Sequence, residues 1–75
     1  MRTVSIKLSS IEDIRQFVDT VSSCSYDVEL SSGSYTIDAK SIMGIFGLDL
    51  SKSVELTVFG DDVDELFENI ASFIV

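Results

Sequence analysis

Residues 9–23, "SSIEDIRQFVDTVSS", decide the fold, because the spacing of apolar side chains changes there from a period of two to a helical period. The apolar residues of this stretch are Ile11, Ile14, Phe17, Val18 and Val21. Their spacing predicts an amphipathic helix with one face turned toward a core. Ser9 and Glu12 have the spacing of a capping box, so we expect the helix to begin at Ser9 or Ser10.

Strands flank this helix on both sides. Residues 3–8 alternate apolar and polar side chains, which puts Val4, Ile6 and Leu8 on one side. The same alternation returns in residues 26–30, 35–38 and 54–58, and Gly33 stands in the short turn "SSGS" between the second and third strands. Alternation indicates that each strand has one face in water and the other against the core.

Two more helices complete the predicted order. The stretch "AKSIMGIFGLDLSK", residues 39–52, predicts a short helix that begins near Ser41. In residues 61–75, Asp62 and Glu65 have the spacing of an N-terminal box before one apolar stripe. The stripe consists of Val63, Leu66, Phe67, Ile70, Phe73 and Ile74. The predicted fold is an α+β open-faced β-sandwich of order βαββαβα, a four-stranded antiparallel sheet with three helices on one face.

Size and charge restrict the classes of partner. Seventy-five residues suit one domain over residues 1–75. Thirteen acidic and five basic residues give a net charge of −8, which repels the phosphates of nucleic acid and of anionic membranes, so neither is expected as a partner. No apolar run reaches the roughly 18 residues of a membrane span. Cys24 is the only cysteine, which fits a reducing, cytoplasmic location.

The residue types also argue against catalysis. The chain has no histidine, and therefore lacks the commonest metal ligand and the commonest general base. It has no glycine-rich loop of the kind that holds phosphate. Asp61, Asp62 and Asp64 stand at the start of the last predicted helix, where negative charge offsets the helix dipole. We therefore predict no enzymatic activity, no metal and no cofactor.

Ser41 admits two interpretations. A serine at a helix start can cap a free backbone N–H, and the same position favours a phosphate on its hydroxyl. The next residues carry more apolar side chains than so short a helix can bury, so a protein-binding surface is expected there. Its candidate residues are Ile42, Met43, Ile45 and Phe46, and at least one of Ile42, Ile45 and Phe46 should close the core.

Together with the element order, the stretch "AKSIMGIFGLDLSKSVELTVFGDD" resembles HPr, the histidine-containing phosphocarrier of the bacterial sugar phosphotransferase system. The resemblance covers nearly the whole chain and extends to Gln16-Phe17-Val18 in the first helix. It implies an open-faced sandwich of four strands and three helices. It also implies that the serine matching Ser41 is the target of a dedicated kinase in Gram-positive members, where the second helix docks enzymes and a transcriptional regulator.

The start of the first helix departs from the family pattern. The family has Gly, Leu, His, any residue, Arg and Pro there, and the histidine receives phosphate from enzyme I. Alignment on Gln16-Phe17-Val18 puts Ser10 at the histidine position, Glu12 at the arginine and Asp13 at the proline. A serine phosphate ester is stable where an imidazole phosphate transfers readily, and carboxylates repel an arriving phosphoryl group. Ser10 is therefore predicted to cap the helix.

Three functions follow from these residues. The first is a histidine-lacking regulatory or adaptor domain that binds a kinase, a regulator or a phosphotransferase component through the second helix, with Ser41 as a phosphorylation switch. The second is a phosphocarrier of sugar transport with another acceptor. The third is a structural domain that associates with itself through "IMGIF", residues 42–46. The sequence leaves the oligomeric state open.

Overall fold

The computed structural model describes residues 1–75 and has the predicted order of strands and helices. The elements are β1 (Arg2–Ile6), α1 (Ile11–Ser22), β2 (Asp27–Ser32), β3 (Tyr35–Asp38), α2 (Ile42–Phe46), β4 (Val54–Phe59), α3 (Asp64–Asn69) and the 3₁₀ turn η1 (Ala71–Phe73). The predicted fold class, an α+β open-faced sandwich, is confirmed.

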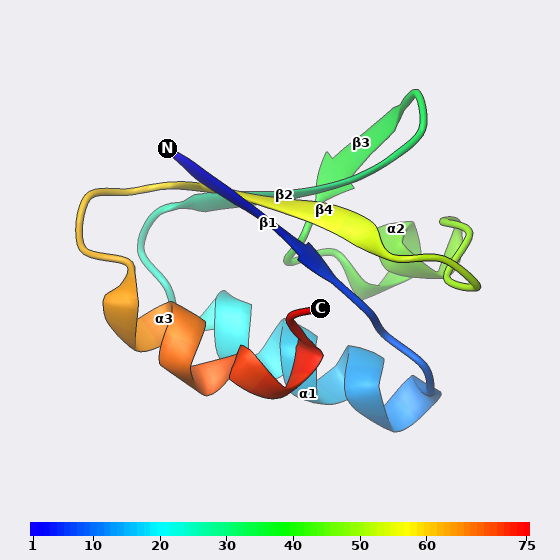
Figure 1. The fold of residues 1–75 in the computed structure, drawn as a ribbon, viewed down its shortest axis with the longest axis horizontal. Coiled ribbons are helices and arrows are strands. Elements are labelled where there is room, and N and C mark those ends of the chain that lie inside the picture. Colours follow the sequence, from blue (N-terminus) through cyan, green and yellow to red (C-terminus); the bar gives the residue numbers. More distant parts are fainter.

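The four strands form one antiparallel sheet in the order β1-β4-β2-β3. In the middle of the sheet, Leu56 of β4 lies opposite Val4 of β1 and Leu30 of β2. Helices α1 and α3 run beneath one face of the sheet, and α2 lies on the same side near β3 (Figure 1). The other face has no helix over it. We call the side chains of that uncovered side the open face.

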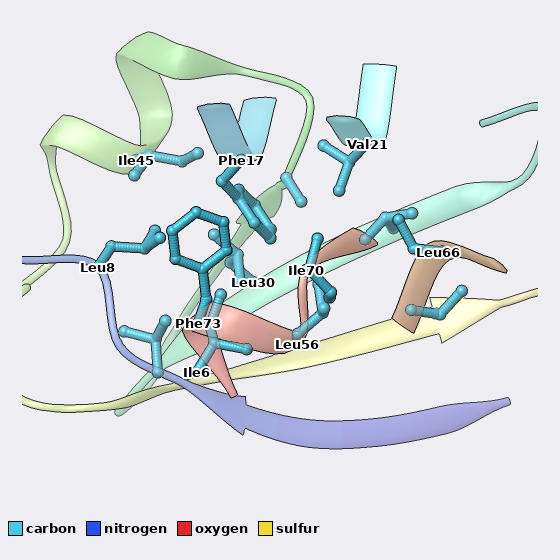
Figure 2. Close-up of a cluster of buried hydrophobic side chains, with 14 of the residues drawn as sticks. Ile6, Leu8, Phe17, Val21, Leu30, Ile45, Leu56, Leu66, Ile70 and Phe73 are labelled. Carbon is cyan, nitrogen blue, oxygen red and sulfur yellow. The ribbon is translucent and has the colours of Figure 1, made fainter. Parts of the chain in front are cut away.

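The core lies between the sheet and the helices, and every buried side chain in it is apolar (Figure 2). Phe17 of α1 meets Phe73 of η1 edge to face, with ring centroids 6.2 Å apart and an interplanar angle of 83°. The buried residues are Ile6, Leu8, Ile14, Phe17, Val21, Val28, Leu30, Ala39, Ile45, Val54, Leu56, Val58, Val63, Leu66, Ile70 and Phe73. Each strand except β3 contributes at least one of them.

The start of α1 is capped by Ser10. Ser10 has extended backbone (φ −143°, ψ 166°), and its Oγ accepts a hydrogen bond from the N–H of Asp13 at 3.1 Å. The Asp13 carboxylate in turn accepts from the N–H of Ser9 at 3.1 Å. The predicted helix start at Ser10 is confirmed. The capping box predicted from Ser9 and Glu12 is wrong, because the extended residue that caps the helix is Ser10 and its partner is Asp13.

The start of α3 differs from the prediction. Val63 occupies the N-cap position, with no capping bond from a side chain, so the box predicted from Asp62 and Glu65 does not form. Val63 is 2% exposed, and its backbone is not helical (φ −110°, ψ 1°). Burial of this side chain delays the helix to Asp64. Asp64 and Glu65 still place negative charge in the first turn, as the dipole argument requires.

The last residues of the chain lie along the outer side of β1. The Lys7 N–H donates to the Phe73 carbonyl at 2.8 Å, and the Val75 N–H donates to the Ser5 carbonyl at 3.0 Å. Ile74, between them, pairs with Ile6. Ile74 is 36% exposed and was wrongly predicted in the buried stripe, because the chain becomes extended after Phe73 (ψ 131° at Ile74).

Ile11 is the second residue that the helical pattern misplaces. It shares the spacing of the buried Ile14 and Phe17, yet it is 66% exposed. The first turn of α1 extends past the end of β1 (Figure 1), so no strand covers the side chain there. Ile11 therefore adds to the surface and not to the core.

Replacement of Phe17 tests which residues of α1 belong to the core and which to the surface. Phe17→Ala should lower the free energy of unfolding by about 3–5 kcal/mol, because it empties a fully buried aromatic site. The matched variant Ile11→Ala, in the same helix, should change it by less than about 0.5 kcal/mol. Chemical denaturation followed by circular dichroism measures both. Equal losses would contradict the burial described above.

Candidate functional site

Ser41 lies at the N-cap of α2. Its backbone is extended (φ −100°, ψ 102°), and its Oγ accepts a hydrogen bond from the Gly44 N–H at 3.3 Å. Its carbonyl accepts from the Ile45 N–H at 3.1 Å, which is the first bond of the helix. The residue is exposed. Ser41 is therefore a helix cap whose hydroxyl can be reached from solvent.

Next to Ser41, α2 leaves two large apolar side chains in water. Met43 is 76% exposed and Phe46 is 47% exposed, and residues three apart lie on one side of a helix. Ile42 is partly buried against the core. Ile45 is fully buried and points from α2 toward Phe17 (Figure 2), so its assignment to the partner-binding surface is wrong. A helix this short needs one anchor in the core, and Ile45 is that anchor.

Gly44 brings α2 close to the sheet edge. A Cβ at this position would lie 3.2 Å from Cδ1 of Ile37 in β3 and 3.3 Å from the Ser41 Oγ. Both separations are tighter than ordinary van der Waals contact. The missing side chain thus allows the helix to pack on β3 while the serine cap stays in place.

Lys40 fixes the chain just before the cap. Its Nζ donates to the carbonyls of Cys24 and Tyr26, at 3.0 Å and 2.9 Å. Its N–H donates to the Asp38 carboxylate at 2.9 Å. The ammonium group therefore ties the beginning of α2 to the loop between α1 and β2. It is committed to those carbonyls and does not extend toward the Ser41 hydroxyl.

The start of α1 lies beside α2. A hollow of about 560 Å³ separates them, lined by Leu8, Ser9, Ser10, Ile11, Ile14, Phe46, Leu50 and Ser51. The exposed Ile11 thus borders the same hollow as Phe46. We call Ile11, Met43 and Phe46 the helix patch. Apolar side chains from two helices give this patch the chemistry of a protein-binding surface.

Ser10, at the edge of the hollow, is followed by two acidic residues in α1. Its Oγ is engaged in the cap, and Glu12 and Asp13 stand in the first turn of α1. In the loop across the hollow, hydrogen bonds from the hydroxyl and then the N–H of Ser51 lower the pKa of the Asp49 carboxyl. No basic side chain lines the hollow. The position is unsuited to receiving a negatively charged phosphoryl group.

A smaller hollow of about 220 Å³ lies between the end of α1 and the start of α3. Cys24 and Tyr26 line it together with Asp62 and Glu65. Burial of the phenol, its hydrogen bond with Cys24 and the two carboxylates raise the pKa of Tyr26 to about 12. The Tyr26 ring also closes over Gly60, where a Cβ would come within 2.8 Å of it. The hollow thus surrounds a neutral phenol and a free thiol.

Two general findings bear on the kind of site. No group of three or more histidine, cysteine, aspartate or glutamate side chains is placed to hold a metal ion. None of the helices has both the length and the apolar content needed to cross a membrane.

Residues 13–75 match the sequence profile of the PTS-HPr family, described as the PTS HPr component phosphorylation site. The chain belongs to the HPr family. The match begins at Asp13, just after Ser10. The resemblance inferred from the sequence is therefore confirmed. HPr proteins are phosphocarriers and not catalytic enzymes, and this chain is a member of that family without a histidine.

Solved structures of the family support this membership. The chain is similar to HPr-C-His from Thermoanaerobacter tengcongensis, with 29% identity and a TM-score of 0.80, covering 96% of this chain and 89% of that one. It is similar to the phosphocarrier protein HPr from Bacillus anthracis, with 25% identity and a TM-score of 0.73, covering 99% and 94%. Crh from Bacillus subtilis matches at 28% identity and a TM-score of 0.67, covering 89% and 79%.

Within this HPr-family fold, two features of the site were missed by sequence reasoning. Ile11 was assigned to the core, and its place in the helix patch follows only from how far α1 extends past β1. The bonds of Lys40 join residues that lie 14 and 16 positions away along the chain. No local pattern signals either feature, because both depend on tertiary packing.

Ser41→Ala tests the cap. It should lower the free energy of unfolding by about 0.5–2 kcal/mol, because the Gly44 N–H loses its acceptor. Ser41→Asp should retain most of the stability, since a carboxylate accepts the same bond and offsets the helix dipole. Amide exchange of Gly44 and chemical denaturation are the measurements. Ser34→Ala, in the exposed hairpin turn, is the control, and an equal effect of both alanine variants would argue against the cap.

Proposed function

We propose that this chain is a non-catalytic regulatory or adaptor protein of the phosphotransferase system. It binds a protein partner through the helix patch, in the cytoplasm, and phosphorylation of Ser41 changes that binding. One observation carries the proposal: the chain contains no histidine, whereas an exposed Ser41 caps the helix that presents Met43 and Phe46.

The proposal first requires that phosphate relay is lost. Relay needs a group that both accepts and releases a phosphoryl group, as imidazole does and a serine hydroxyl does not. Ser10, at the position matched to the histidine, uses its oxygen in the α1 cap and stands next to Glu12 and Asp13. What the fold keeps is the surface that α1 and α2 form together.

Phosphorylation of Ser41 would alter this surface directly. A phosphate adds roughly −1.5 to −2 charge and three acceptor oxygens at the start of α2. The nearest exposed apolar side chain in sequence is Met43, two residues away. The modification therefore puts charge at the border of the helix patch, where it can add a charged contact for one partner and repel another.

The relatives support regulation as the function. Crh from Bacillus subtilis is named as a catabolite repression containing protein, and its structure is an intertwined, domain-swapped dimer. An HPr from Thermoanaerobacter tengcongensis, 28% identical, was also solved as a dimer. These dimers favour self-association as a second candidate, for which the helix patch is our proposed contact, and the experiments below separate it from adaptor function.

The switch is tested with a bacterial HPr kinase and ATP. Intact mass spectrometry should show a gain of about 80 Da, the mass of one phosphoryl group, in the parent chain and in Ser10→Ala, but none in Ser41→Ala. The same chain treated with phosphoenolpyruvate and enzyme I should show no gain. A phosphoprotein formed in that second reaction would restore the carrier function and overturn the proposal.

The docking surface is tested with the catabolite regulator that binds HPr proteins in Gram-positive bacteria. Met43→Glu should weaken binding of the phosphorylated chain by roughly tenfold or more, because it replaces the most exposed apolar side chain of the helix patch with a charge. Lys52→Glu, a solvent-exposed change away from the helix patch, is the control. Sedimentation of the same proteins decides the second candidate: a parental dimer that Met43→Glu dissociates would favour self-association.

A further inference from the structure

The open face of the sheet carries negative charge without compensation. Because Val28 and Leu30 are buried on the helix side, the alternating residues Asp27 and Glu29 of β2 stand on the open face. The register places Asp38 of β3 there, opposite Glu29, and Glu55 of β4 opposite Ser31. No strand residue on this face is basic.

The basic side chains nearest the sheet are engaged in other contacts. Arg2 of β1 lies over the ring of Phe67 in α3, 4.4 Å from its centroid, and contacts Asp64 at 3.4 Å. Lys7 donates to the carbonyl of Leu50, at 3.1 Å, and Lys40 is held by two carbonyls. The open face therefore stays negative, and Glu29 and Asp38 face each other as like charges, an arrangement that destabilises a strand pair.

Beside this charge lies the unpaired edge of β3. The Ala39 N–H donates to the Val28 carbonyl at 2.9 Å, and Leu30 lies opposite Ile37, so residues 35, 37 and 39 turn their backbone groups toward β2. By the same alternation, the backbone groups of Thr36 and Asp38 face away from the sheet. The Asp38 carbonyl accepts from the Ser41 N–H. The Thr36 N–H and carbonyl and the Asp38 N–H remain for another strand.

The sequence of β3 does nothing to protect this edge. Its four residues, "YTID", include no lysine and no proline, and they form no bulge. The opposite edge differs, since the last residues of the chain bond to β1. A hollow of about 320 Å³ opens where β3 ends, lined by Asp27, Val28, Glu29, Thr36, Ile37, Asp38 and Phe59. An aromatic ring among carboxylates suits a lysine or arginine side chain.

We propose that β3 is a second docking site, which takes an extended segment of a partner protein as a fifth strand with alternate lysine or arginine side chains over the open face. The backbone of the segment bonds to Thr36 and Asp38, and its basic side chains meet Glu29, Asp38 and Asp27 near the Phe59 ring. This surface uses the edge of β3 and the open face, and none of its contacts uses the side chain of Ser41 or of a helix-patch residue.

The acidic surface favours a basic partner segment over a second copy of the chain and over a metal ion. A second copy of the chain would bring its own acidic β3 against this one, and like charges across the new pair would repel. A metal ion needs converging ligands, and no three acidic side chains are so placed. Ammonium or guanidinium groups spaced along a strand match carboxylates that are spread over the sheet.

The probe is a peptide of about seven residues with alternating lysine and valine, titrated into ¹⁵N-labelled protein. We expect saturable NMR shifts of the Thr36 and Asp38 amides and slowed hydrogen exchange of both. A peptide of the same composition with its lysines in one block, and one with glutamate in place of lysine, should produce neither effect.

Two variants separate the backbone contribution from the charge. Thr36→Pro removes an N–H that faces away from the sheet, a change that edge strands tolerate, together with the hydroxyl contact to Ser31, and should weaken binding about three- to tenfold. Thr3→Pro is the matched control on β1, the other edge strand. The backbone groups of Thr3, like those of Ser5, face away from β4, so peptide binding should be unchanged. Glu29→Gln with Asp38→Asn should weaken binding and flatten its salt dependence, and Glu12→Gln with Asp19→Asn should not.

The results decide the proposal. Equal binding by the block peptide, unchanged binding by Thr36→Pro, or shifts confined to the helix patch would overturn it. Concentration-dependent shifts of β3 without peptide would assign the edge to self-association and also overturn it. If Thr36→Pro unfolds, the exchange of the Thr36 and Asp38 amides in the parent chain decides in its place.

Discussion

Burial on one side of a single sheet is the constraint on which the rest of this molecule depends. β4 lies between β1 and β2, and its inward residues Val54, Leu56 and Val58 share the core with both neighbours. Because all helices must cover that side, the other side stays in water. Only the longest helix, α1, and the C-terminal α3 and η1 span the sheet, so α2 is left at its margin. A helix of five residues there can bury one side chain well, and its other apolar residues become surface.

Sequence periodicity predicts the arrangement of sheet and helices, because it indicates which face of each helix or strand is buried. The four strands and the helix α1 follow from spacing, and the cap at Ser41 follows from a serine that precedes an apolar run. The burial of residues at the ends of helices cannot be predicted in the same way. Ile11 and Ile74 fit the buried stripes by spacing, but one lies beyond the strands and the other follows the end of the last helical turn. A stripe is buried only where something lies opposite it, and that is a property of the whole fold.

The first turn of α1 combines a capping serine with two acidic residues. Ser10, Glu12 and Asp13 supply a capping hydroxyl and two carboxylates at the positive end of a helix dipole. These residues suit helix stability, and for the same reason they oppose an incoming phosphoryl group. If the alignment on Gln16-Phe17-Val18 holds, the positions of the family's histidine, arginine and proline serve here to cap the helix. The neighbouring apolar surface of Ile11 and Phe46 can bind a protein whether or not phosphate is transferred. Such binding requires contact area and not a reactive group.

Charge then sets how such a surface could be switched. A chain at −8 already repels anions at long range, so about two more negative charges on Ser41 change its overall field only modestly. A phosphate there must act through short-range contacts with a partner group that complements it. The ammonium group of Lys40 is already bonded to the carbonyls of Cys24 and Tyr26, and not to Ser41. Under the proposed function, a cation that complements a phosphate on Ser41 would come from the partner, and the choice of partner would distinguish the two states of Ser41.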